Sequence, residues 1–229
     1  MVARERKADM RARTQRIAAM LARLYPDARI SLDFETPWQC LAATILSAQC
    51  TDERVNRVTP ALFRAYPDAQ ATARANTRDL QRLIATTGFF RQKARSLIEA
   101  ARSIVDRFGG EVPSRMDDLT TLSGVGRKTA NVVRGHVFGE AGMVVDTHVR
   151  RLSRRLGLSR NHDPAKIESD LCALLPPAEW TRFSMGLILH GRRVCQARQP
   201  KCETCALRPH CPQIGVRNRA QRKHARAKT

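Results

Sequence analysis

Four cysteines near the end of the chain have the residue type and spacing to bind a metal centre. Cys195, Cys202, Cys205 and Cys211 follow the pattern C-x6-C-x2-C-x5-C. Four thiolates this close in sequence, including one CxxC pair, can all reach a single metal site. Zinc ribbons also use four cysteines, but usually as two separated CxxC pairs. Disulfides would need an oxidising compartment, which nothing else in the sequence indicates.

The charge of the chain predicts a polyanionic partner. Its 229 residues include 41 Lys and Arg against 21 Asp and Glu, giving a formal net charge of +20. Hydrophobic residues make up 42% of the chain, which is typical of a globular protein. A folded chain with this excess of positive charge most often binds nucleic acid. The alternative is a basic protein associated with ribosomes or membranes.

The sequence favours a cytoplasmic protein without a membrane partner. No segment reaches the length of a membrane span, and the N-terminus lacks the apolar stretch of a secretory signal. The first residues form a basic arm that Glu5 and Asp9 interrupt, whereas mitochondrial transit peptides are poor in acids. Cys40, Cys50 and Cys172 lie among apolar neighbours and are interpreted as small core residues.

Apolar residues recur with helical spacing along most of the chain, which predicts an all-α fold. One amphipathic pattern runs from Ala94 to Phe108 and stops at Gly109-Gly110. Another helix opens at Thr36-Pro37, where proline suits the first turn. Further helices are expected from Val149 to Leu156, from Ile167 to Leu175 before Pro176-Pro177, and from Trp180 to Leu189.

Residues 122–130 read LSGVGRKTA and predict a turn between two helices. A short helix is expected from Met116 to Leu122, and a second is expected to start near Arg127. Gly124 and Gly126 allow backbone angles that a side chain would forbid, and they let backbone N–H groups approach a phosphate. The positive N-terminal end of the second helix, with Arg127 close by, would add to this attraction. Such a contact reads no base sequence.

Four motifs together resemble the endonuclease III-type DNA glycosylases. That family carries LPGVGRKTA followed by VDTHV, with the aspartate eighteen residues after the lysine; here Asp146 lies eighteen residues after Lys128. Residues 47–52 read SAQCTD, similar to the family's SAQxTD, and residues 189–192 read LHGR, similar to its LxHGR. Ser123 replaces the usual proline of the hairpin, which could loosen it slightly.

The resemblance implies two helical lobes with a DNA-binding cleft between them. Residues 30–140 would form a six-helix barrel with a helix–hairpin–helix motif, and residues 1–29 with 141–219 would form an iron–sulfur lobe. Residues 220–229 would be a basic C-terminal tail. The resemblance also implies a [4Fe–4S] cluster on the four cysteines, which would shape a basic loop and perform no chemistry. The protein is expected to act as a monomer on damaged or abasic DNA of a bacterial nucleoid.

By the same resemblance, Lys128 and Asp146 would face each other across the cleft as catalytic residues. An amine that attacks C1′ of the sugar forms a Schiff base, which permits β-elimination of the 3′ phosphate. Desolvation in the cleft and the helix N-terminus would both favour a neutral lysine. Asp146 would accept a proton and stabilise positive charge on the sugar. Taken singly, Lys128 could be a surface lysine and Asp146 a helix N-cap.

Further residues are candidates for DNA contact once a base is flipped out of the duplex. Gln49 would fill the vacated space, and Phe89 stands where the family has an apolar wedge, often leucine. Phe89 could instead pack in the core at a helix start, and Gln49 could be a plain loop residue. His148, Arg198 and Lys201 could reach substrate or phosphates, although His148 could simply be a surface residue.

The resemblance leaves two alternatives and an open substrate range. An adenine-mismatch glycosylase would usually lack the lysine and carry an extra C-terminal domain. A non-catalytic DNA-binding scaffold would not need Lys128 and Asp146 together. Oxidised pyrimidines such as thymine glycol are the expected substrates, and mismatched or photodamaged pyrimidines remain possible.

Overall fold

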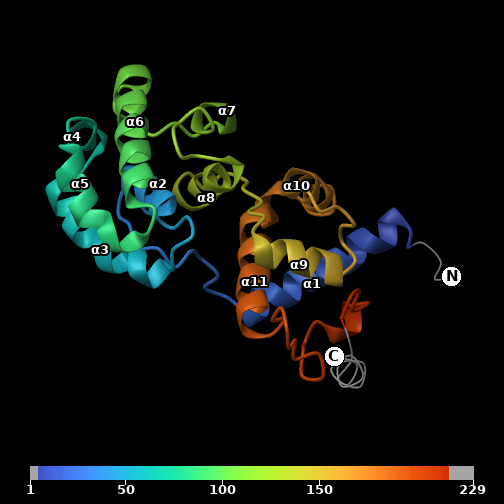
Figure 1. The fold of residues 1–229 in the computed structure, drawn as a ribbon. Helices are drawn as coiled ribbons and strands as arrows, with labels where there is room; N and C mark the ends of the chain where they lie inside the picture. The colour runs from blue at the N-terminus through green and yellow to red at the C-terminus, as the bar shows by residue number, and fades with distance from the viewer. Residues whose placement is uncertain (1–4, 217–229) are drawn as a thin grey trace. The chain divides into compact units, whose positions relative to one another are not determined.

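The chain folds into α-helices joined by turns and loops. The computed structural model describes residues 5–216, and no β-strand occurs among them, so the expected all-α class is confirmed. The expected tail at residues 220–229 lies outside the described residues. The chain divides into two compact units, which are drawn in Figure 1. One unit spans Arg29–Gly142, and the other combines the described residues up to Ala28 with those from Met143 onward.

The unit that contains the cysteines is built around a long N-terminal helix. Helix α1 packs against α11, and α11 packs against α9 (Figure 1). Gly186 of α11 permits a close approach, since a Cβ there would lie 3.0 Å from Cβ of Leu21 in α1. The elements of this unit are α1 (Lys7–Leu24), α9 (Thr147–Arg155), α10 (Pro164–Cys172), η2 (Pro177–Glu179), α11 (Trp180–Arg193) and η3 (Arg208–His210).

Two arginines of the expected basic arm form hydrogen bonds to backbone oxygens within their own unit. Arg13 forms an ion pair with Glu5 at 2.8 Å, and its Nη1 donates to the backbone oxygens of Leu156 and His210. Arg11 donates to the backbone oxygen of Ala173. These guanidinium groups therefore tie α1 to the ends of α9, α10 and η3, and part of the N-terminal charge has a structural use.

The second unit surrounds a core that α2 and α6 share. Helix α6 contacts α2, α4, α5 and η1, and α2 also contacts α3 and α8. Leu41, Leu46, Leu97 and Ile104 are almost fully buried in this core. The elements are α2 (Pro37–Leu46), α3 (Asp52–Ala65), α4 (Ala69–Ala73), α5 (Thr77–Ile84), η1 (Ala85–Thr87), α6 (Phe90–Phe108), α7 (Met116–Leu119) and α8 (Arg127–Val137).

Local chemistry sets several helix ends where the sequence predicted them. The Thr36 hydroxyl accepts a hydrogen bond from the Gln39 N–H and caps α2, while Pro37 occupies the first turn. Gly109 ends α6 in the left-handed conformation, with φ of 64°. Both boundaries are confirmed.

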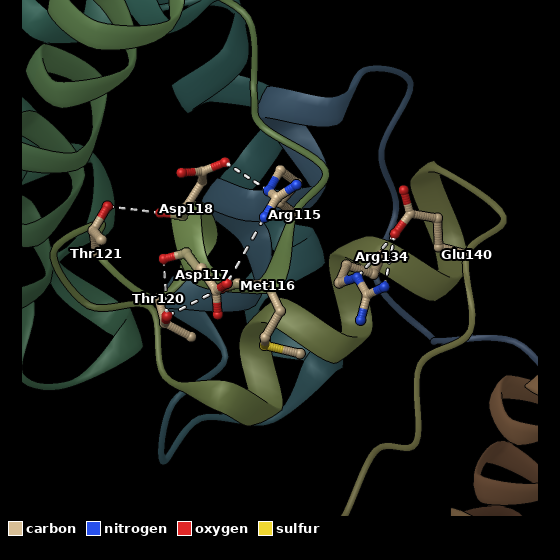
Figure 2. Close-up of polar contacts among 8 residues, drawn as sticks. All are labelled: Arg115, Met116, Asp117, Asp118, Thr120, Thr121, Arg134 and Glu140. Carbon is tan, nitrogen blue, oxygen red and sulfur yellow. Dashed lines mark hydrogen bonds and ion pairs between the residues drawn. The ribbon is translucent and has the colours of Figure 1, made fainter.

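Two helices end earlier than expected. Helix α10 stops at Cys172, so Leu174 and Leu175 are buried in a turn rather than in the helix. Helix α7 stops at Leu119 instead of Leu122. Figure 2 shows the reason for α7: the Thr120 hydroxyl donates to the carbonyls of Met116 and Asp117, and the Thr121 hydroxyl donates to Asp118. These hydroxyls satisfy helix-end carbonyls and favour termination.

Ion pairs secure the elements on either side of the hairpin (Figure 2). Arg115 lies 3.7 Å from the Asp118 carboxylate at the start of α7. Arg134 pairs with Glu140 at 2.8 Å, just beyond the end of α8. Both pairs belong to the unit that carries residues 122–130. One lies at the start of α7 and the other at the end of α8, the two helices that flank the hairpin.

The hairpin between α7 and α8 requires glycine at its tip. Gly124 has φ of 77°, and a Cβ there would lie only 2.9 Å from Cβ of Ser96 in α6. A side chain would therefore be strained and would also collide with α6. The Ser123 hydroxyl donates to Glu99 of α6 at 2.7 Å. This bond fastens the hairpin at the position where the family usually has proline.

None of the helices between residues 5 and 216 combines the length and apolar composition that crossing a bilayer requires.

Candidate active site and cysteine cavity

Lys128 is the second residue of α8, directly after the glycine hairpin. Gly126 begins the helix in an extended conformation and offers no side chain to cap it. The lysine therefore sits in the first turn, where the helix dipole is positive. Its side chain is exposed, as are Gly126 and Arg127. The first turn of α8 therefore does not itself desolvate Lys128, and the desolvation expected in a DNA-binding cleft stays a prediction.

Asp146 caps the N-terminus of α9. Its Oδ1 accepts hydrogen bonds from the backbone N–H groups of His148 and Val149, both at 2.8 Å. An aspartate in this position typically contributes about 1 kcal/mol to stability. Both capping bonds use the same oxygen, so the cap does not occupy Oδ2. The structure therefore gives Asp146 a capping role and leaves a carboxylate oxygen that could take part in proton chemistry.

His148 is half-buried and held by an arginine from its own helix. Nη2 of Arg151 lies 3.1 Å from His148 Nδ1, and guanidinium is only a donor, so Nδ1 must accept. Burial lowers the pKa of His148; Arg151 and Arg192 act in the same direction, and Asp146 opposes them. A neutral ring would carry its proton on Nε2.

Gln49 and Phe89 share an uncommon backbone conformation. Gln49 has φ of 53° and Phe89 has φ of 48°, both in the left-handed region that non-glycine residues rarely adopt. Gln49 follows the end of α2, and Phe89 immediately precedes α6. Phe89 is 66% exposed, so the alternative of a core phenylalanine is wrong. Gln49 is exposed as well.

The four cysteines line one cavity in the other unit. The sulfur-bearing residues Cys195, Cys202, Cys205 and Cys211 share its wall with apolar groups that include Leu152, Val194 and Leu207. Burial raises the pKa of the Cys205 and Cys211 thiols. Within residues 5–216, no three His, Cys, Asp or Glu side chains are arranged to hold a single metal ion.

Arg155 of α9 holds the first loop of this cavity. Its Nη1 donates to Cys195 Sγ at 3.3 Å and to the Gln196 carbonyl at 2.8 Å. Its Nη2 donates to the Ala197 carbonyl at 2.8 Å. Arg151, one turn earlier, donates to the carbonyls of Cys195 and Gly191. Neither arginine stood out in the sequence, and their spacing of one helical turn is the only local signal that could have pointed to a shared target.

His190 links the cavity to α1. Its Nε2 lies 3.3 Å from Cys205 Sγ, and its Nδ1 lies 3.0 Å from the Tyr25 hydroxyl. Burial lowers the pKa of His190 to about 4, so the ring is neutral near pH 7. Tyr25 had no recognisable signal in the sequence, because it lies 165 positions away from the histidine that it contacts.

Arg198 and Lys201 are exposed on the loop between Cys195 and Cys202. Lys201 also lines the cavity, and its backbone N–H donates to the Val194 carbonyl at 3.0 Å. Of the other cysteines, Cys40 is fully buried, with a pKa raised by burial to about 12, which fits a core residue. Cys50 and Cys172 are only partly buried.

Comparison with known proteins identifies the family. Residues 42–177 match the model of the HhH-GPD superfamily base excision DNA repair proteins. The chain is 56% identical to endonuclease III of Synechocystis sp. over 206 residues, which cover 90% of this chain and 94% of the relative. It is 40% identical to endonuclease III of Bacillus subtilis over 189 residues, covering 82% and 86%.

A solved structure described as a trapped endonuclease III–DNA covalent intermediate superimposes with a TM-score of 0.84. That protein is 37% identical in sequence, and the match covers 89% of this chain and 96% of the other. Family model, relatives and fold agree with the four motifs, and the chain belongs to the endonuclease III family within the HhH-GPD superfamily of base excision DNA repair proteins.

Proposed function

We propose that this protein is a bifunctional DNA glycosylase and AP lyase of base excision repair that removes oxidised pyrimidines from duplex DNA. The observation that carries the proposal is that Lys128 lies in the hairpin motif and that Asp146, eighteen residues later, caps α9, in a chain similar to endonuclease III over nearly its whole length. A related protein has been captured in a covalent complex with DNA, as expected for a nucleophilic mechanism.

In the proposed reaction, Lys128 Nζ attacks C1′ of the damaged nucleotide. The bond from C1′ to the base breaks, and the base leaves with a proton. The amine and C1′ then form a Schiff base as the C1′–O4′ bond breaks and O4′ takes up a proton. Loss of a proton from C2′ next breaks the C3′–O bond, the 3′ phosphate leaves with the rest of the strand, and the strand is cut 3′ to the lesion. Asp146 accepts a proton through its free oxygen and stabilises positive charge on the sugar. Because Lys128 is exposed in the free protein, bound DNA would have to supply the desolvation that favours a neutral amine.

The DNA contacts proposed from the sequence fall on exposed residues, except that His148 is half-buried. Backbone N–H groups at Gly124 and Gly126, with Arg127 and the N-terminus of α8, would bind a phosphate. Gln49 and Phe89 would enter the space that the flipped nucleotide leaves. His148, Arg198 and Lys201 are proposed to contact the backbone of the duplex. The protein would act as a monomer in the cytoplasm, on DNA of the nucleoid.

We further propose that Cys195, Cys202, Cys205 and Cys211 hold a [4Fe–4S] cluster. Two observations support the fit: all four residues line one cavity, and polar nitrogens reach two of the sulfurs. Arg155 Nη1 donates to Cys195 Sγ, and His190 Nε2 lies 3.3 Å from Cys205 Sγ, where a ring protonated on Nε2 would donate. Such donors stabilise thiolate ligands. When bound, the cluster would cross-link the C-terminal loop, and Arg198 and Lys201 would depend on it for their position. No step of base excision is assigned to it.

Chemical trapping tests the nucleophile. Sodium borohydride should reduce the Schiff base and join wild-type protein covalently to a duplex with thymine glycol or an abasic site. Lys128→Gln should bind the same duplex but form no adduct, because it lacks the amine. Lys166→Gln, at an exposed lysine of α10, is the matched control and should trap like wild type. An adduct with Lys128→Gln would mean that another amine attacks C1′. Excision without trapping would favour a monofunctional enzyme, and binding without excision would favour a scaffold.

The role of Asp146 can be separated from its cap. Asp146→Asn keeps an oxygen that can accept from the His148 and Val149 amides, so the fold should persist. The single-turnover excision rate should fall by about 10²- to 10⁴-fold, the usual contribution of a positioned acid–base group. Asp163→Asn is the control, since Asp163 caps α10 in the same way through a bond to the Lys166 amide. A similar small effect of both substitutions would limit Asp146 to a structural role.

Metal analysis tests the cluster. Protein purified without oxygen should be yellow-brown and contain about four irons and four sulfides per chain. Cys202→Ser should lower iron content, folded yield and DNA affinity together, because the basic loop would lose its cross-link. Cys172→Ser, outside the cavity, should keep the full iron content. One zinc per chain without sulfide would contradict the proposal.

A further inference from the structure

A buried lysine lies beneath the two residues proposed to enter DNA. Lys93, in the first turn of α6, is only 5% exposed. Its Nζ donates to the backbone carbonyls of Leu46 and Thr87, both at 2.8 Å. Removing an ammonium group from water is unfavourable unless it is well paired. The position of Lys93 therefore needs an explanation, and the proposed chemistry does not use this residue.

The two acceptors are carbonyls at helix ends. Leu46 is the last residue of α2, and Thr87 is the last residue of η1. Carbonyls in a last turn lack helical partners and carry partial negative charge, so a cation is favoured there. Burial lowers the pKa of Lys93, and the nearby Cys50 opposes this shift. The ammonium thus joins the ends of two elements that are far apart in the sequence.

Each of these carbonyls lies just before a proposed DNA-inserting residue. Gln49 is three residues after Leu46, and Phe89 is two residues after Thr87. Both have left-handed backbone angles, which persist only where the surroundings enforce them. The backbone N–H of Lys93 also donates to the Phe89 carbonyl at 3.0 Å. One residue therefore fixes the backbone before Gln49, before Phe89 and at Phe89 itself.

We propose that Lys93 is a positioning residue that holds the Gln49 and Phe89 loops at a fixed separation, so that both side chains enter the duplex together when the damaged nucleotide leaves it. The proposal rests on the glycosylase function proposed above. Lys93 does not contact DNA in this account. It acts by keeping two loops in the conformation that base extrusion requires.

The separation of the Gln49 and Phe89 loops that Lys93 maintains should matter most for the step that extracts a base from the duplex. A damaged base must be unstacked before excision, whereas a preformed abasic site has no base to extract. Lys93→Met keeps most of the side-chain volume but leaves the Leu46 and Thr87 carbonyls without their donor. The two loops should then separate or shift, while Lys128 and the hairpin remain as they are.

Single-turnover kinetics on two duplexes test this proposal. With Lys93→Met, excision of thymine glycol should slow by about tenfold to a hundredfold, as expected for a small misplacement of groups that act together. Strand cleavage at a preformed abasic site should change much less. Lys93→Arg, which keeps the charge and several donors, should recover part of the excision rate. Borohydride trapping at the abasic site gives the active fraction of each variant.

Two controls separate positioning from loss of stability or charge. Ile104→Val removes one methylene group from a buried side chain near the other end of α6 and should lower both rates in proportion to the active fraction. Lys166→Met removes one positive charge from the exposed face of α10 and should leave the ratio of the two rates unchanged. If Lys93→Met does not fold, Lys93→Gln, with a shorter side chain and one amide donor group, replaces it.

A fluorescent base analogue opposite the lesion gives an independent readout. In the Lys128→Gln background, which binds without chemistry, the analogue should become unstacked; adding Lys93→Met should reduce that signal at equal occupancy. Equal losses of both rates, or an unchanged signal, would show that Lys93 has only a structural role. An inactive wild type that forms no adduct would instead overturn the proposed function, and this inference with it.

Discussion

Unsatisfied backbone groups at helix ends are the constraint on which this structure depends. Every helix leaves N–H groups at its start and carbonyls at its end without helical partners, and burying them unpaired is unfavourable. At the start of α9 the partner is Asp146; at the ends of α2 and η1 it is Lys93. In both cases a charged side chain stabilises a helix end and is also linked to the proposed function. Asp146 is itself proposed to be catalytic, and Lys93 binds the backbone just before Gln49 and Phe89.

The same constraint organises the cysteine cavity. Beyond the end of α11 the chain turns into the Cys195 loop, where Arg151 and Arg155 supply donors to backbone carbonyls. Because both arginines project from α9, the helix that Asp146 caps also supports the loop. Loss of the cavity should therefore disturb the backbone of the Cys195 loop as well as the four cysteines. This arrangement explains how the proposed cluster, to which no chemical step is assigned, would still matter for DNA binding.

The start of α8 has no side-chain cap, which suits the phosphate contact proposed there. Gly126 has no side chain to cap the helix, and Gly126, Arg127 and Lys128 are all exposed. A capping side chain would satisfy the first amides of α8 internally and compete with a phosphate. Gly124 allows the hairpin to approach α6 closely, and the bond between Ser123 and Glu99 fastens it there.

Much of the fold could be predicted from the sequence because its signals are local. The cap at Thr36, the glycine stop at Gly109 and the helix start at Arg127 each depend on a few adjacent residues. The ends of α7 and α10 were placed too late: apolar spacing continues past them, while Thr120 and Thr121 terminate α7 through side-chain bonds. The exposure of Lys128 could not be predicted, because a motif gives the position of a residue but not its exposure.

The contacts of Lys93, Arg155 and Tyr25 could not be predicted. Each of these polar side chains pairs with a partner at least 40 positions away, and such pairings leave no periodic signal. Phe89 had two interpretations in the sequence, as a wedge or as a core residue. Its exposure in the structure decides against the core.

The most direct test of the account is to locate the covalent bond. Wild-type protein trapped by borohydride on a duplex with a single abasic site would be digested with nuclease and trypsin, and its peptides analysed by mass spectrometry. A lysine joined to the sugar resists trypsin, so the account predicts the mass of a deoxyribose remnant on the peptide from Lys128 to Arg134. A remnant on any other peptide would contradict the assignment of Lys128 as the nucleophile.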